Sequence, residues 1–164
     1  CCHGRQCGLA DYYRQIHLFF LRGKEGSELD NSVQQQHLYD TTPWKGNIVQ
    51  KLFLKTYISY TRNQENQTPE FQQLIKTLKN KYGGIENIPQ AFKDEFRSLS
   101  LPMMKWANIL TFNTRAICLY VACLIDFPWL YIVFEILVMT SLYFYMRYTH
   151  EAFCKKLNSK IQLA

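Results

Sequence analysis

The sequence predicts an all-α protein: a fragment of an integral membrane helical bundle with a C-terminal transmembrane hairpin and a helical cytoplasmic segment. Three observations lead to this fold class. Apolar residues recur at three-to-four spacing over much of residues 9–97, no stretch alternates long enough for a strand, and residues 106–146 are nearly all apolar. With 48% hydrophobic and 15% aromatic residues, the composition excludes a disordered tail, a collagen-like repeat and a low-complexity linker.

The first expected helix covers residues 9–21 and has one apolar face. Gly23 and Gly26 follow it and should end it. A short polar helix is expected next, over residues 28–38. The apolar face of the first helix is formed by Leu9, Tyr12, Tyr13, Ile16, Phe19 and Phe20.

Further amphipathic helices are expected up to residue 97. One starts near Trp44 and ends at a polar break over residues 63–67; it places Lys45, Lys51 and Lys55 largely away from its apolar face. The next opens with Thr68 as cap and Pro69 at its first position, and it ends at Gly83-Gly84. A short helix follows over residues 89–97. The two apolar faces consist of Ile48, Val49, Leu52, Phe53, Tyr57 and Tyr60, and of Phe71, Leu74, Ile75 and Leu78.

Two apolar stretches, residues 107–125 and 127–146, are long enough to cross a membrane. At 1.5 Å rise per residue each measures about 30 Å, the thickness of a bilayer core. They carry one charge each, Arg115 and Glu135, and the tight connection at Asp126 makes them a hairpin. The alternative is a buried hairpin in a soluble bundle, but the second stretch has no polar face. We therefore divide the chain into a cytoplasmic segment (1–105), the hairpin (106–147) and a basic cytoplasmic tail (148–164).

Positive charges predict the orientation of the hairpin. Lys and Arg residues precede and follow it, whereas its connecting turn has none, so both ends of the chain should face the cytoplasm. The basic amphipathic helices of the first segment can then rest on anionic head groups. Nucleic acid is not expected as a partner, because residues 1–100 interleave 13 Lys and Arg with 10 Asp and Glu.

Arg115 and Glu135 are the most informative residues of the hairpin. A charge inside a membrane is costly and is usually paired or turned toward a polar cavity. In antiparallel helices their depths differ by three residues, about 5 Å, so an ion pair between them is expected. Alternatively, Arg115 faces a cavity that binds an anionic group such as a phosphate. Asn108 and Asn113 are the other polar candidates for an intramembrane or substrate-facing role.

Several phrases resemble the later part of CDP-alcohol phosphatidyltransferase family proteins of a Bacteroides-type subgroup. The resemblance covers nearly the whole chain and implies a bundle in the bacterial inner (cytoplasmic) membrane. It also implies the transfer of a phospho-group from a CDP-activated alcohol or lipid to an alcohol acceptor, with release of CMP, as in phospholipid biosynthesis. The phrases are residues 10–14 (ADYYR), 17–21 (HLFFL), 26–30 (GSELD), 43–46 (PWKG), 98–102 (SLSLP) and 108–115 (NILTFNTR).

The catalytic signature of that family is absent from this chain. The signature is D-G-x-x-A-R, then eight residues, then G-x-x-x-D-x-x-x-D, and its acids hold Mg²⁺ or Mn²⁺ in the parent enzyme. No Asp here is followed by Gly, so no catalytic residue is carried over. No metal is expected on this chain alone, since the cysteines near Cys1 match no zinc spacing.

The chain also begins at Cys1 without a signal sequence, so we expect a C-terminal fragment of such an enzyme, inactive alone. Its partners would be membrane lipid and, in the parent, a CDP-alcohol and an alcohol acceptor; a homodimer is left open. The alternative function is a non-catalytic membrane-anchored binding or scaffold protein.

Overall fold

The computed structural model describes residues 2–22, 31–44, 46–83 and 87–163, and all regular structure in these ranges is helical. The predicted all-α fold class is therefore confirmed. The helices are α1 (Cys2–Arg22), α2 (Ser32–Thr41), α3 (Ile48–Gln67), α4 (Pro69–Tyr82), α5 (Gln90–Ile109), α6 (Phe112–Leu124), α7 (Trp129–Val133), the π-helical η2 (Phe134–Met139) and α8 (Thr140–Leu163).

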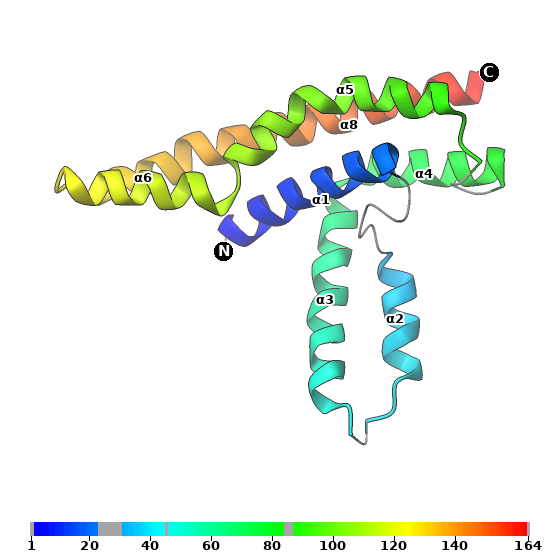
Figure 1. Ribbon diagram of the computed structural model, residues 1–164, viewed down its shortest axis with the longest axis horizontal. Helices are drawn as coiled ribbons and strands as arrows, with labels where there is room; N and C mark the ends of the chain where they lie inside the picture. Colours follow the sequence, from blue (N-terminus) through cyan, green and yellow to red (C-terminus); the bar gives the residue numbers. More distant parts are fainter. Residues whose placement is uncertain (1, 23–30, 45, 84–86, 164) are drawn as a thin grey trace.

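Two long helical rods run antiparallel along the molecule (Figure 1). One consists of α5 followed by α6, and the other of α7, η2 and α8 in succession. α1 packs along α5, and α4 packs along α8. The hairpin of α2 and α3 projects sideways from this body, and the turn between α6 and α7 forms one end of the molecule.

The apolar face predicted for residues 9–21 forms the centre of the core. Leu9, Ile16 and Phe20 are at most 2% exposed, and the ring of Phe20 stacks on that of Phe96 with centroids 4.0 Å apart. The segment expected to be a basic tail (148–164) is helical up to Leu163, and several of its side chains are buried in the same core. The core residues from α4 and α8 include Phe71, Leu74, Leu78, Met146, Phe153, Cys154, Leu157 and Ile161.

α1 and α3 are longer than the sequence predicted. α1 begins at Cys2 rather than near Leu9, and α3 continues through the expected polar break at residues 63–67. That break is wrong because the polar side chains find distant partners: Gln64 Nε2 donates to the Gly8 carbonyl at 2.8 Å, and Glu65 accepts from the Ser32 amide at 2.9 Å. Tertiary hydrogen bonds of this kind override weak local helix propensity.

The N-terminus of α4 is capped by a different residue from the one predicted. Pro69 occupies the first position as expected, but the Thr68 hydroxyl donates back to the Gln64 carbonyl at 3.1 Å and does not cap α4. Instead, Glu151 of α8 accepts from the Glu70 amide at 2.7 Å. A carboxylate there satisfies a free amide and complements the helix dipole. At the other end Gly83, with φ of 70°, closes α4 as predicted; Gly84 lies outside the described residues.

The short helix expected at residues 89–97 continues through Pro102 to Ile109 as α5. The first apolar stretch, residues 107–125, is not one straight helix, since α5 ends at Ile109 and α6 begins at Phe112. The second stretch starts as α7, widens into η2, and continues far beyond Met146 to Leu163. In the predicted helix at 28–38, residues 28–30 lie outside the described part, and α2 extends to Thr41.

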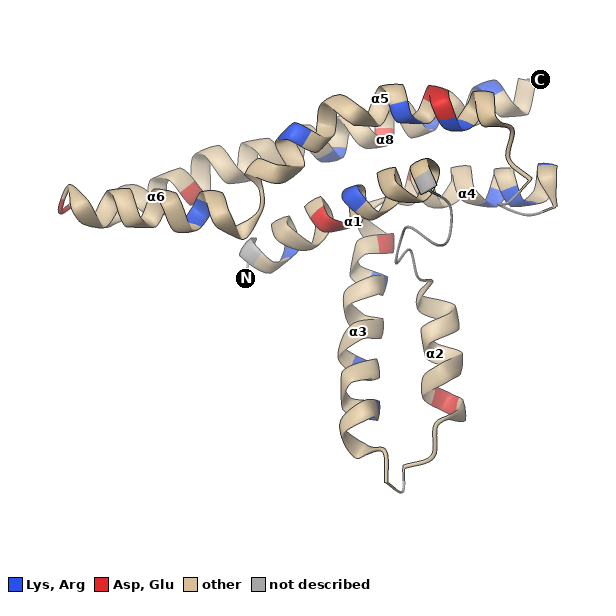
Figure 2. Cartoon of the chain, viewed as in Figure 1, with Lys and Arg blue, Asp and Glu red and all other residues tan. Residues whose placement is uncertain are grey.

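Two helical stretches are long and apolar enough to cross a membrane, Gln90–Leu124 and Trp129–Leu163; their 18-residue apolar windows have mean hydropathies of 1.3 and 1.6. Their most apolar windows are only 22% and 11% buried within the chain. A core helix of a soluble protein would hide such residues, whereas here Tyr120, Leu124 and Leu137 are more than 60% exposed. In Figure 2 the α6 end of the molecule carries few charged residues, in contrast to the opposite end.

Candidate functional site

The candidate site is a polar cluster where α6, η2 and the start of α1 meet. Arg115 lies in the first turns of α6 and is 1% exposed, which makes it the largest fully buried side chain among the described residues. It follows directly after the interruption at Leu110 and Thr111 that separates α5 from α6. The interruption and the buried charge therefore occupy the same place in the fold.

Arg115 and Glu135 form the expected ion pair. Arg115 Nε donates to Glu135 Oε2 at 2.9 Å and to Oε1 at 3.2 Å. The two side chains are 2% and 19% exposed, so water screens the pair only weakly. Glu135 belongs to η2, a π-helical stretch of a kind often found at functional sites.

The remaining guanidinium nitrogens of Arg115 also have protein partners. Nη1 donates to the Leu110 carbonyl and contacts Cys7 Sγ at 3.1 Å, and Nη2 donates to Gln6 Oε1. Cys7 Sγ in turn donates to the Leu110 carbonyl at 3.4 Å. Each of the three nitrogens of Arg115 thus contacts an acceptor within the chain, which favours a structural role over binding of a phosphate.

Gln6 extends the cluster to the first residue of α8. Its Nε2 donates to Thr140 Oγ1 at 3.3 Å, and Thr140 Oγ1 donates to the Glu135 backbone carbonyl at 3.3 Å. Gln6 is 3% exposed, and both ends of its amide bond the protein: Oε1 accepts from Arg115 and Nε2 donates to Thr140. The cluster therefore ties α1, α6 and η2 together around one charge pair.

Gln6 and Cys7 were not predicted as site residues, because the apolar spacing placed the start of the first helix near Leu9. A signal was present: Gln6 lies four residues before Ala10 and seven before Tyr13, both of which are buried. Extending the helix by two turns would have placed Gln6 on the buried face.

The structure does not bring the two predicted asparagines into the cluster. Asn108 is exposed on α5, and its Oδ1 accepts from Arg14 Nη2 of α1 at 2.8 Å. Asn113 is exposed in the first turn of α6. Of the four candidates, Arg115 and Glu135 lie together and the asparagines lie apart from them.

A second buried polar group joins α1, α4 and α8. The His150 ring, 2% exposed, stacks on the Tyr13 ring with centroids 4.0 Å apart, and its Nδ1 lies 3.4 Å from Glu151 Oε1. Nearby, burial raises the pKa of Tyr12 to about 12, although its bond from Gln72 opposes this shift. These groups pack α1, α4 and α8 against one another.

A third buried contact lies where α1 crosses α5. His17 Nδ1 is 2.7 Å from Ser100 Oγ. Burial lowers the pKa of His17, and the positive charge of Arg97 adds to the effect. His17 is therefore neutral at neutral pH.

The described residues contain no group of three or more His, Cys, Asp or Glu side chains arranged to hold a metal ion. The cluster around Arg115 holds one carboxylate, already paired with the guanidinium. No protein-family model matches the chain, and neither a curated protein nor a solved structure is similar to it at a significant level.

Proposed function

We propose that the chain is the C-terminal, membrane-embedded part of a phosphotransferase that moves a phospho-group from a CDP-activated alcohol or lipid to an alcohol acceptor and releases CMP. The observation that carries this proposal is the sequence segment at residues 108–115, which resembles the CDP-alcohol phosphatidyltransferase family and ends at Arg115. The same eight residues contain the interruption between α5 and α6 and the buried arginine. The resemblance thus falls on a break in the helical backbone and on the buried charge beside it.

The proposed setting is a bacterial inner membrane with both ends of the chain in the cytoplasm. The charge distribution supports this orientation: Lys105 precedes the apolar hairpin, Arg147 follows it, and the turn at Asp126 carries no Lys or Arg. Figure 2 shows the same asymmetry along the molecule, with the blue residues concentrated away from the turn between α6 and α7.

The residues of the cluster do not fit the divalent metal that the proposed reaction requires. Mg²⁺ and Mn²⁺ need several oxygen ligands, whereas Glu135 is engaged by a guanidinium that would repel a cation. The metal-binding acids would therefore come from a part of the parent protein that carries the D-G-x-x-A-R signature. Within this chain, the ion pair of Arg115 and Glu135 joins α6 to η2 and so fixes the position of these two helices in the proposed bundle.

A second candidate function is a non-catalytic membrane-anchored scaffold. The observation in its favour is that each nitrogen of Arg115 contacts a protein acceptor, so that the cluster can be explained by structure alone. The two functions predict different coding sequences before Cys1, because only the enzyme requires the D-G-x-x-A-R signature there.

The test combines the gene sequence with an activity measurement. Membranes containing the full gene product are supplied with Mg²⁺ or Mn²⁺, with CDP-diacylglycerol or a CDP-alcohol as donor, and with a panel of alcohol acceptors. We expect the signature upstream of Cys1 and release of CMP that a chelator abolishes. The purified 164-residue chain is the matched control and should release none. An upstream sequence without the signature, or turnover by the isolated chain, would overturn the proposal.

A further inference from the structure

Helix α3 has its apolar face on the outside. Six residues of this face are between 37% and 71% exposed, the most exposed being Phe53. The sequence correctly predicted which residues share the face, but most of the face is not covered by the protein; only Tyr57 and Tyr60 at its C-terminal end approach α1. It consists of Ile48, Val49, Leu52, Phe53, Tyr57 and Tyr60, and we call it the outer face of α3.

The opposite side of α3 packs on α2 through a charged residue. Lys51, which lies away from the apolar face as expected, is 4% exposed, and its Nζ lies 4.5 Å from the ring centroid of Tyr39 and 4.6 Å from that of Trp44. Contacts between a cation and aromatic faces stabilise a desolvated lysine. Water-soluble helical hairpins normally bury phenylalanine and expose lysine, whereas this hairpin encloses a lysine and exposes a phenylalanine. A contiguous apolar face of this size indicates a binding surface.

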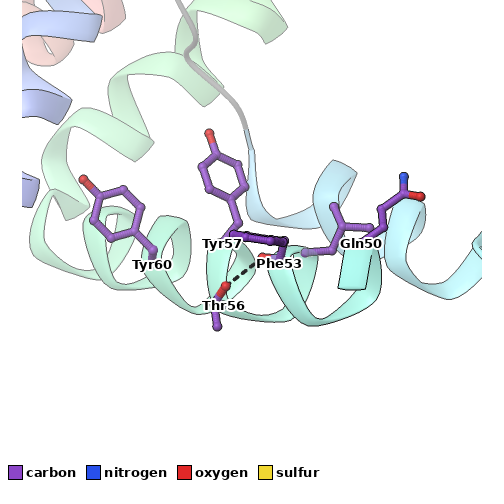
Figure 3. A pocket seen from close by; sticks show the side chains of 6 residues that line it. Gln50, Phe53, Thr56, Tyr57 and Tyr60 are labelled. Atoms are coloured by element: carbon purple, nitrogen blue, oxygen red, sulfur yellow. Dashed lines mark hydrogen bonds between the residues drawn. The ribbon is translucent and has the colours of Figure 1, made fainter. Parts of the chain in front are cut away.

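Two polar residues, Thr56 and Ser59, lie among the apolar residues of the outer face. The Thr56 hydroxyl donates to the Phe53 carbonyl at 2.8 Å. Figure 3 shows this bond and the side chains of Tyr57 and Tyr60, which rise from the same helix; with Gln50 and Phe53 they line a shallow groove. Since the Thr56 hydroxyl is satisfied within the helix, it needs no water.

The position of α3 along the molecule coincides with one edge of the apolar stretches at residues 107–125 and 127–146. α3 is fixed to α1 at Gly8 by the hydrogen bond from Gln64, and Arg14 of α1 bonds Asn108. Trp106 is close to Asn108 in α5, is 42% exposed, and packs edge-on against Tyr145 of the other rod. Amphipathic aromatic residues of this kind occupy membrane–water interfaces.

A second exposed aromatic pair marks the other edge. Phe127 and Trp129 lie at the turn between α6 and α7, and they are 53% and 56% exposed. Trp106 and Phe127 are 21 positions apart, which at 1.5 Å per helical residue corresponds to about 30 Å, the thickness of a bilayer core. The level at which α3 leaves the body is therefore the cytoplasmic edge of the membrane proposed above.

The orientation of α3 at this level also suits a surface helix. In Figure 1 α3 runs sideways across the direction of the two rods, and α2 covers it on the side away from α6. The outer face, opposite α2, consequently turns toward the side on which the α6–α7 turn lies. With the hairpin inserted, that side is the lipid.

We propose that α3 lies flat on the anionic phospholipid surface of the same membrane, with its outer face at the boundary between head groups and acyl chains. Lys55 and Arg62 are both exposed and lie seven residues apart, on one line of the helix that borders the outer face. They are placed to contact lipid phosphates while the aromatic residues insert. This inference rests on membrane insertion of the hairpin but not on the proposed phosphotransferase activity.

Photo-crosslinking in vesicles tests the proposal and distinguishes its alternatives. The photoreactive residue benzoylphenylalanine replaces Phe53 of the outer face, Gln34 on the exposed side of α2, or Leu137 in the second span. Each variant is reconstituted in vesicles of equal parts phosphatidylcholine and phosphatidylglycerol, and adducts are identified by mass spectrometry. We expect phospholipid adducts at positions 53 and 137 and none at 34. Replacing phosphatidylglycerol by phosphatidylcholine should lower the yield at 53 severalfold and leave 137 unchanged.

Each contrary outcome has its own meaning. Lipid adducts at 137 without any at 53 would overturn the proposal, and a crosslink from 53 to a second copy of the chain would replace the lipid surface with a dimer interface. Adducts at neither position would refute membrane insertion itself. The release of CMP by the full gene product is measured separately, so the two proposals can fail independently.

Discussion

Neutralising Glu135 should weaken the packing of α6 against η2 without changing side-chain size. In Glu135→Gln the guanidinium of Arg115, 1% exposed, keeps its neutral acceptors Gln6 and the Leu110 carbonyl but loses its counter-charge. In Arg115→Met the losses are greater, because the carboxylate, the Gln6 amide and the Leu110 carbonyl all lose a donor. The structure therefore predicts that the arginine substitution is the more damaging of the two.

The expected loss in free energy of unfolding depends on the burial of the ion pair and on the contacts that its residues make in the unfolded state. Breaking a buried ion pair costs about 3–5 kcal/mol in soluble proteins. The cost here should be smaller, since Glu135 is 19% exposed and since polar groups of helices unfolded in a membrane also find partners. We expect about 2 kcal/mol for Glu135→Gln, about 3 kcal/mol for Arg115→Met, and a coupling of about 1–2 kcal/mol in the double mutant.

The assay is the free energy of unfolding in mixed detergent micelles, measured for the parent, both single variants and the double variant. Ile136→Ala is the matched control, because Ile136 is the next residue of η2 and is 60% exposed; it should change the free energy by only a few tenths of a kcal/mol. A coupling energy indistinguishable from zero would refute the ion pair as a stabilising contact. Arg115 would then be the better candidate for a residue that faces substrate in the parent enzyme.

Two further predictions concern the packing of α4 on α8 and of α1 on α5. Glu151→Gln should destabilise the fold by about 1 kcal/mol, because the charged cap on the Glu70 amide and the α4 dipole is lost; an unchanged midpoint of detergent unfolding would contradict this role. The lowered pKa of His17 means that below about pH 6.5 the unfolded chain binds the proton first, so stability should fall as the pH drops through this range. His17→Gln should reduce that pH dependence, measured as the free energy of unfolding against pH. If the slope of this plot were unaltered, His17 would not be its source.

The features that the sequence predicted correctly depend on short-range geometry. Helical spacing alone assigned Leu9, Ile16 and Phe20 to one buried face. The contact between Arg115 and Glu135 followed from the rise per residue in two antiparallel helices, because a tight turn leaves little freedom in their register. Both inferences use distances along one element or across one short connection.

The features that it missed depend on partners far away in the chain. Residues 63–67 stay helical because Gln64 bonds Gly8, which is 56 positions away. The cap of α4 is Glu151, 81 positions from Glu70. Periodicity also distinguishes the apolar side of α3 from its polar side, but it does not say which side the rest of the protein covers. The apolar side of an amphipathic helix is usually the covered one, whereas in α3 the side that carries Lys51 is covered, by Tyr39 and Trp44.

The polar cluster explains why two irregular backbones and two charges coincide in an otherwise apolar hairpin. The interruption after Ile109 leaves the Leu110 carbonyl without a helical donor, which is costly away from water. Arg115 supplies that donor from the next turn, but an arginine in such surroundings requires a counter-charge, and Glu135 provides it. On the facing rod Thr140 donates to the Glu135 carbonyl, and Gln6 links Thr140 back to Arg115. Each polar group is thus tolerable because the others are present, so the kink, the π-helical turn and the ion pair should be gained or lost together.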